Sequence, residues 1–361
     1  MKDKILVVGG YGQVGQYASL KLASMFPNKV IVAGRSLEKA NSFAKEHRGL
    51  FEVLQLDIYD INNMPDIMKN ISVVIMCLMS KNNDFAKFCV DNGIHYVDIA
   101  PSDNVMKGIE QFKETAIKNS STCVLGVGLA PGLSNLLVKK AKHQFDTMQR
   151  VNIHLMLGVG EAHGNDGVKW FLDNIYKNFV RNESGVNKKI KPFIRKSKTR
   201  FPEPLGVRGA YPFNLADQFI TPKTLNIENV SSYFCYDSKA ITSLVSVLKR
   251  FGVFGLLKWS ALYNLISKLF NATLRMFHKQ GIGTDVYSVQ VDAFGIKNGK
   301  KHTYNIGAIG YNNSLLTGGI AATVASQLYE GNCLGGVFYL EDLFSLEDLE
   351  KFGICLKIEV R

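Results

Sequence analysis

A glycine-rich turn near the start of the sequence constrains the fold of this chain more than any other feature. The run GGYGQVG at residues 9–15 contains the spacing G-x-G-x-x-G and directly follows the apolar strand pattern KILVV. Apolar residues then recur at helical spacing from Gln13 to Phe26. In such a strand–turn–helix unit, the glycines permit a tight turn and a close approach of the backbone to a pyrophosphate. The free N–H groups at the start of the helix also attract an anion. We therefore expect a dinucleotide-binding turn formed by Gly10, Tyr11, Gly12, Gln13, Val14 and Gly15.

The end of the second strand pattern indicates which dinucleotide is bound. About 20 residues after the glycine turn, an NAD-specific site has an acidic residue that binds the ribose 2′-hydroxyl. This chain has Arg35 and Ser36 there. A guanidinium cannot accept that hydrogen bond, but it pairs well with a 2′-phosphate. We therefore predict NADP(H) as the cofactor, with a solvent-facing Arg35 as the alternative.

Three further residues follow strand patterns of the same region. Asp57, after the third strand pattern, either lies beside the adenine or caps the next turn. Cys77, after the fourth, is expected to pass near the cofactor through its main-chain atoms. Gly128 belongs to the turn after the sixth. Ligands of open parallel sheets bind at this carboxyl edge of the strands.

Strand and helix patterns alternate over residues 1–130. The strand patterns, such as VIVAG and SVVIM, are apolar on both faces, which predicts helices on both sides of a parallel sheet. Right-handed connections then predict an α/β fold with a doubly wound parallel sheet, the Rossmann arrangement. The pattern changes after Pro131, and we expect a second domain over 131–310.

Positive charge is concentrated in two stretches. The formal net charge is +12, from 43 basic and 31 acidic residues. Seven basic residues and no acid lie between Glu183 and Glu203, and the same holds between Asp237 and Asp285. The two stretches fall in an insertion at about 185–280, where the first is expected to be a basic loop.

The second basic stretch is also apolar and reads as one or two amphipathic helices broken near Gly252 and Gly255. Two interpretations stay open for 240–279. This segment either contacts an anionic membrane surface or forms a helical hairpin that packs on its own domain or on a dimer partner. No nucleic-acid-binding motif accompanies the charge, so we expect no nucleic acid partner.

Cysteine and histidine are dispersed along the chain. The six cysteines form no C-x-x-C pair and the seven histidines do not cluster, which predicts reduced thiols and no metal site. No stretch of 18 residues is both apolar and uncharged, and the first apolar run is too short for a signal peptide. We therefore expect a cytoplasmic protein.

The runs GGYGQVG, VIVAGRS, HYVDIA, VLGVGLAPGLSNLL and TGGIAATVASQL resemble the saccharopine dehydrogenase-like family over nearly the full chain. The resemblance implies an NADP-binding Rossmann domain, a second mixed α/β domain and C-terminal helices over 311–361 that return to the first domain. It also implies a homodimer, and hydride transfer at a C–N or C=O bond of a small amino-acid-derived substrate.

One departure from the family concerns the active site. Saccharopine reductases resemble G-L-D-P-G after the sixth strand, with an acidic residue implicated in the reaction, whereas this chain has Ala130. Saccharopine is therefore not the expected substrate. The alternative to an oxidoreductase is a dinucleotide-binding protein that has lost catalysis.

Three residues are candidates for direct chemistry, of which His163 and Asp98 are the first two. Hydride transfer to an imine or carbonyl requires a nearby proton donor. His163, in GEAHG, is one candidate because its ordinary pKa of about 6.5 suits a general acid or base. It either serves this role or caps the following helix. Asp98, at the end of HYVD, is the other, and its alternative is to cap a turn. Glu161 is a further candidate.

Overall fold

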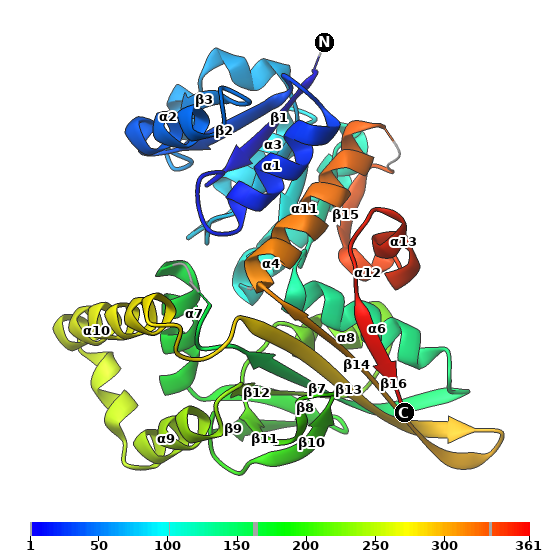
Figure 1. The fold of residues 1–361 in the computed structure, drawn as a ribbon. Coiled ribbons are helices and arrows are strands. Elements are labelled where there is room, and N and C mark those ends of the chain that lie inside the picture. The colour runs from blue at the N-terminus through cyan, green and yellow to red at the C-terminus, as the bar shows by residue number, and fades with distance from the viewer. Residues whose placement is uncertain (1, 101, 162–164, 332–333) are drawn as a thin grey trace. The chain divides into compact units, whose positions relative to one another are not determined.

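The chain forms two compact units, which are described separately. The computed structural model describes residues 2–100, 102–161, 165–331 and 334–361. The first unit contains residues up to Gly128 together with Ser314–Ile354, and the second contains Leu129–Asn313 together with Cys355–Arg361 (Figure 1).

The first unit is built on a seven-stranded sheet in the order β15-β6-β5-β4-β1-β2-β3, in which every pair of neighbours is parallel. Chain order reverses between β1 and β4, and this switch point is where open α/β sheets bind ligands. The strands are β1 Lys4–Val8, β2 Val30–Gly34, β3 Glu52–Gln55, β4 Ile71–Met76, β5 His95–Asp98, β6 Thr122–Leu125 and β15 Gly336–Tyr339.

Burial explains why these segments form the middle of a parallel sheet. All five residues of β2 are buried, as are the last four of β1, because helices cover both faces. The predicted Rossmann fold is thus confirmed. The helices of this unit are α1 Gly15–Met25, α2 Leu37–Glu46, α3 Asp84–Asp91, α4 Asp103–Glu110, α5 Lys113–Lys118, α11 Asn313–Tyr329, α12 Leu340–Leu343 and α13 Leu346–Lys351, with short 3-10 turns at η1 Ile61–Asn63 and η2 Asp66–Asn70.

The C-terminal segment contributes more than helices to the first unit. Helix α11 lies beside α1 (Figure 1), so closely that a Cβ at Gly318 would lie 2.7 Å from the carbonyl oxygen of Val14. Strand β15 then pairs with β6, with Gly336 opposite Thr122. The sequence patterns did not predict this strand, because its four residues acquire their conformation from a partner more than 200 positions away.

The second unit contains a mixed seven-stranded sheet in the order β10-β11-β12-β7-β13-β14-β16. Only β12 and β7 are parallel to each other, and the other neighbours are antiparallel. A separate hairpin is formed by β8 and β9. The strands are β7 Thr147–Leu157, β8 Phe179–Glu183, β9 Val186–Ile190, β10 Ser197–Phe201, β11 Gly206–Pro212, β12 Asn229–Tyr236, β13 Val286–Lys297, β14 Lys300–Tyr311 and β16 Lys357–Val360.

Two details differ from the sequence-based expectations. The basic stretch after Glu183 is not a loop but strands β9 and β10, whose exposed lysines hide the strand pattern. Lys188 of β9 pairs with Glu183 of β8 at 2.6 Å. The end of the chain also does not return to the first unit with the helices, since β16 pairs with β14 through backbone hydrogen bonds.

An aromatic cluster forms one core of the second unit. The ring of Phe213 lies 5.5 Å from Phe171, 5.9 Å from Phe193 and 5.3 Å from Phe234, centroid to centroid. Helix α7 and strand β12 contribute two of these rings. The helices of this unit are α6 Ser134–Lys142, α7 Asn165–Tyr176, α8 Asp217–Leu225, α9 Lys239–Arg250 and α10 Ser260–Lys279, with shorter turns at η3 Leu129–Leu133 and η4 Val253–Lys258.

No helix in the described ranges is both long and apolar enough to cross a membrane.

Replacing Phe213 tests the aromatic cluster. Its side chain is fully buried, so Phe213→Ala should lower the free energy of unfolding by about 3–5 kcal/mol through lost burial and the resulting cavity. Trp170 lies 5.3 Å from Phe213, and its fluorescence during urea unfolding is the measurement. Phe251 is 82% exposed, so Phe251→Ala is the matched control and should change stability by at most about 0.5 kcal/mol. Equal effects of the two variants would contradict the role of the cluster.

Candidate functional site

The glycine turn between β1 and α1 has the geometry that a dinucleotide requires. Gly9 has φ +76°, and its N–H donates to the carbonyl oxygen of Ala33 at 2.7 Å. A Cβ at Gly15 would overlap the carbonyl oxygen of Gly9, and a Cβ at Gly12 would lie 3.0 Å from that same oxygen. Only glycines allow α1 to begin this close to β1, which leaves the helix start open to a ligand.

The start of α1 presents free hydrogen-bond donors. The N–H groups of Gln13, Val14 and Gly15 donate to no acceptor in the described ranges, and no side chain caps the helix. The first turn also carries no acidic residue. Such a helix start stabilises a negative charge through its N–H groups and its dipole. The residues present therefore fit the pyrophosphate of a dinucleotide.

Tyr11 connects the glycine turn to the end of β2. The N–H of Ser36 donates to the Tyr11 hydroxyl at 3.2 Å, and a Cβ at Gly34 would overlap that hydroxyl. Ser36 in turn caps α2, since its Oγ accepts the N–H of Lys39 at 3.3 Å. The turn after β2 is thus held against the glycine turn by one phenol, which places Arg35 next to the same site.

Arg35 is exposed, and its guanidinium has no hydrogen bond or ion pair to any described residue. Its carbonyl oxygen accepts the side-chain amide of Gln55 at 3.1 Å. The backbone is therefore fixed while the charged group is free to meet a ligand, as a 2′-phosphate site requires. Sequence reasoning missed Gln55, because an isolated polar residue at a strand end carries no signal of its role.

The other predicted cofactor residues lie at the carboxyl edge of the sheet. Asp57 is exposed and accepts the N–H of Tyr59 at 3.0 Å, so it caps a turn, and its contact with adenine stays a prediction. The N–H of Cys77 donates to Val8 at 3.0 Å. Burial raises the pKa of the Cys77 thiol to about 12, so this group stays protonated. Gly128 is buried at the end of the first unit.

Asp98 is completely buried and holds a turn. Its Oδ1 accepts the N–H of Ala100 at 2.6 Å, and its Oδ2 accepts the Tyr96 hydroxyl at 3.3 Å. Burial raises the pKa of this carboxyl to about 7, although both hydrogen bonds favour the charged form. The structure confirms that Asp98 caps a turn. Its direct participation in the reaction stays a prediction.

Glu161 and Ala130 belong to the second unit. His163 lies outside the described residues. Glu161, close to it in sequence, is buried, with 5% of its surface exposed. Ala130, which replaces the acidic residue of saccharopine reductases, is half-buried.

The second unit contains a buried polar network that the sequence patterns did not predict. The Ser134 hydroxyl donates to Asp217, and the Asn135 side chain donates to Thr221 at 3.3 Å. All four side chains are buried between α6 and α8. Burial raises the pKa of Asp217 to about 6. The run APGLSNLL contains Ser134 and Asn135, but Asp217 and Thr221 are more than 80 positions away.

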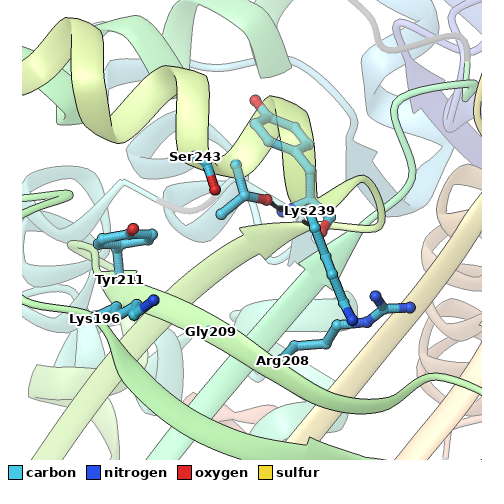
Figure 2. Close-up of a pocket in the computed structure, with 8 residues that line it drawn as sticks. Lys196, Arg208, Gly209, Tyr211, Lys239 and Ser243 are labelled. Carbon is cyan, nitrogen blue, oxygen red and sulfur yellow. Dashed lines mark hydrogen bonds between the residues drawn. The ribbon is translucent and has the colours of Figure 1, made fainter.

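A cationic hollow of about 150 Å³ also lies in the second unit (Figure 2). The Lys239 side chain extends from the start of α9 toward Arg208 of β11. The three charged groups at the hollow form no ion pair with any described residue, so its chemistry suits an anion. The hollow is lined by Lys196, Arg208, Gly209, Tyr211, Tyr236, Lys239, Thr242 and Ser243.

Metal ligands do not gather in the described ranges, where no group of three or more His, Cys, Asp or Glu side chains is arranged to hold an ion.

The fold and the glycine turn define an α/β protein with a dinucleotide-binding domain. Residues 5–124 match the family described as Saccharopine dehydrogenase NADP binding domain. This match confirms both the resemblance and the NADP(H) cofactor predicted from the sequence.

The full chain has the fold of a solved saccharopine dehydrogenase. The apo histidine-tagged saccharopine dehydrogenase (L-Glu forming) from Saccharomyces cerevisiae superposes with a TM-score of 0.71 at 15% identity, covering 99% of this chain and 100% of that one. DAP dehydrogenase of C. glutamicum, in complex with DAP, gives a TM-score of 0.48 at 12% identity, covering 97% and 99% of the two chains. Among curated proteins, no match to the sequence is found.

The pH dependence of stability tests the burial of Asp98. Because its pKa is raised in the folded state, the folded protein keeps a proton between pH 4 and 7 that the unfolded chain releases. Stability should therefore fall as pH rises through this range, by up to about 4 kcal/mol from this group. In Asp98→Asn the loss of stability due to Asp98 should be absent, whereas the loss of stability due to the raised pKa of Asp217 should persist.

The measurement is urea unfolding of both proteins followed by far-UV circular dichroism from pH 4 to 8. Tryptophan fluorescence does not report on the first unit, because both tryptophans, Trp170 and Trp259, lie in the second. Parallel pH profiles for the wild type and Asp98→Asn would contradict the raised pKa.

Proposed function

We propose that this protein is an NADP(H)-dependent oxidoreductase that transfers a hydride at a C–N or C=O bond of a small amino-acid-derived metabolite. The observation that carries the proposal is a glycine turn with open N–H donors next to a free Arg35 guanidinium. The family match of residues 5–124 supports it.

The pyrophosphate and the 2′-phosphate of the cofactor have candidate partners in the first unit. The N–H groups of Gln13, Val14 and Gly15 would bind the pyrophosphate, and Arg35 with Ser36 would bind the 2′-phosphate. When bound, NADP(H) supplies or accepts the hydride. The chain itself would bind, orient and exchange a proton with the substrate.

The proton would come from His163, whose ordinary pKa lies close to neutrality. Asp98 would either take part in the proton transfer or position the turn at Ala100, whose N–H its buried carboxyl accepts. The second unit would supply most of the substrate contacts. A homodimer stays part of this proposal.

Ala130 favours a second candidate function, dinucleotide binding without catalysis. A methyl group can neither hold a proton nor bind a substrate ammonium, so the acidic function of saccharopine reductases is missing at this position. The same observation is compatible with an oxidoreductase for another substrate, and a substrate screen distinguishes the two.

Arg35 variants test the cofactor site. NADPH and NADH are titrated in parallel against the full chain, and nicotinamide fluorescence is measured. The wild type should prefer NADPH, and Arg35→Gln should weaken NADPH binding by about 10- to 100-fold through loss of a charge-assisted hydrogen bond. NADH binding should change little, so the preference should largely disappear.

Lys45→Gln is the matched control, because it removes one positive charge at the far end of α2 and should leave both affinities unchanged. Unchanged selectivity in Arg35→Gln would contradict the assignment of the 2′-phosphate site. NADPH oxidation is then screened with imines, keto acids and aldehydes. Turnover that is lost in His163→Gln with NADPH affinity retained would support catalysis, and binding without any turnover would favour the second candidate.

A further inference from the structure

Large apolar side chains are unusually exposed around α10 and the turn before it. Phe251 is 82% exposed and Trp259 is 69% exposed. On α10 itself, Leu265, Leu269 and Met276 are exposed to about half of their surface, at 53%, 59% and 45%. Such a gathering of apolar groups is costly in water and marks an interaction surface.

The exposed side of α10 has an apolar and a basic stripe. Leu265, Leu269 and Met276 are separated by four and seven residues and therefore share one side of the helix. Lys268, Arg275 and Lys279 are separated by seven and four residues and form a neighbouring stripe. These six residues are called the α10 face below. The helix has 20 residues, which corresponds to a length of about 30 Å.

Packing on the opposite side fixes which residues face outward. The Phe270 ring stacks on Phe171 of α7 at 5.7 Å, and Leu274 is buried. At the end of the helix, Nδ1 of His278 lies 2.7 Å from the carbonyl oxygen of Gly160. Helix α10 is thus attached to the second unit (Figure 1), and the α10 face is its exposed side.

Three lysines on or beside the α10 face have no partner among the described residues. No acidic residue occurs between Asp237 and Asp285. The side chains of Lys258, Lys268 and Lys279 have no hydrogen bond or ion pair to any described residue. The other basic stretch differs, because Lys188 and Arg200 pair with Glu183 and Glu203.

We propose that the α10 face binds the surface of an anionic lipid bilayer, with the apolar stripe among the acyl chains and the basic stripe at the headgroups. Charge complementarity selects this occupant. A second copy of the same face would bring two basic stripes together and repel. This inference goes beyond the proposed function and does not depend on it.

The arrangement matches a helix that lies in the membrane interface. Such helices combine apolar residues on one side with lysine and arginine beside them, and they sink only to the boundary of the headgroups. Lysine and arginine stems lie along apolar surface while their charges stay in water. Trp259, at the start of α10, has the amphipathic ring that prefers this depth.

Vesicle co-sedimentation of the full chain tests the proposal. Vesicles of phosphatidylcholine alone are compared with vesicles containing one quarter phosphatidylserine, at low and at high salt. The protein should sediment with the anionic vesicles at low salt, and binding should weaken as salt screens the charges. Trp259 emission should shift to the blue on binding, and Trp259→Phe should remove that shift.

Paired variants separate the α10 face from general positive charge. Lys268→Gln with Lys279→Gln should lower the vesicle partition coefficient by about 25-fold, because each lysine contributes about fivefold near an anionic surface. Leu265→Gln with Leu269→Gln should lower it at least about tenfold. The matched control, Lys196→Gln with Lys239→Gln, also removes two charges, but from the cationic hollow, and should leave binding within about twofold.

Circular dichroism and NADPH affinity should be unchanged in every variant, since all seven substituted positions are exposed. Three results would overturn the proposal. The first is no sedimentation of the wild type with anionic vesicles. The second is an equal loss in the hollow control, which would assign binding to that site or to net charge. The third is a concentration-dependent dimer that Leu265→Gln with Leu269→Gln abolishes, without vesicle binding, which would show that a second copy covers the α10 face.

Discussion

The close approach of α1 to β1 is the constraint on which the first unit depends. A side chain at Gly15 would overlap the carbonyl oxygen of Gly9, so the helix begins where it does only because that side chain is missing. The same approach leaves three N–H groups at the helix start without acceptors among the described residues. One steric condition thus creates both the packing of the sheet and the anion-binding character of its edge.

Tyr11 extends this constraint to the specificity of the site. Its hydroxyl accepts the N–H of Ser36 and occupies the space that a side chain at Gly34 would need. The turn that carries Arg35 is therefore positioned by the glycine turn and by Gln55, while the guanidinium stays exposed. Because the backbone of this turn is already fixed and the guanidinium is exposed, binding a phosphate here costs little conformational entropy.

Each of the two units contains a buried aspartate whose carboxyl accepts hydrogen bonds within the protein. Asp98 receives donors from Ala100 and Tyr96, and Asp217 receives one from Ser134. In both cases burial raises the pKa more than the hydrogen bonds lower it. These carboxyls stabilise a turn and a contact between helices inside the protein. The charged side chains that we propose as binding groups, such as Arg35 and Lys268, are exposed.

The sequence by itself predicted the Rossmann fold, the glycine turn and the role of Arg35. The alternation of strand and helix patterns is local, and the glycine turn and Arg35 belong to one strand–turn–helix–strand unit. It also located the amphipathic helices of the basic apolar stretch, whose period is local. Only the tertiary structure revealed strands β9, β10, β15 and β16, the network around Asp217 and the face of α10 that packs inward. Strands β15 and β16 and the network around Asp217 depend on pairing across distant positions, as between Thr122 and Gly336, and local patterns do not encode which distant segment supplies the partner. Strands β9 and β10 pair with strands next to them in the chain, but their exposed lysines hide the strand pattern.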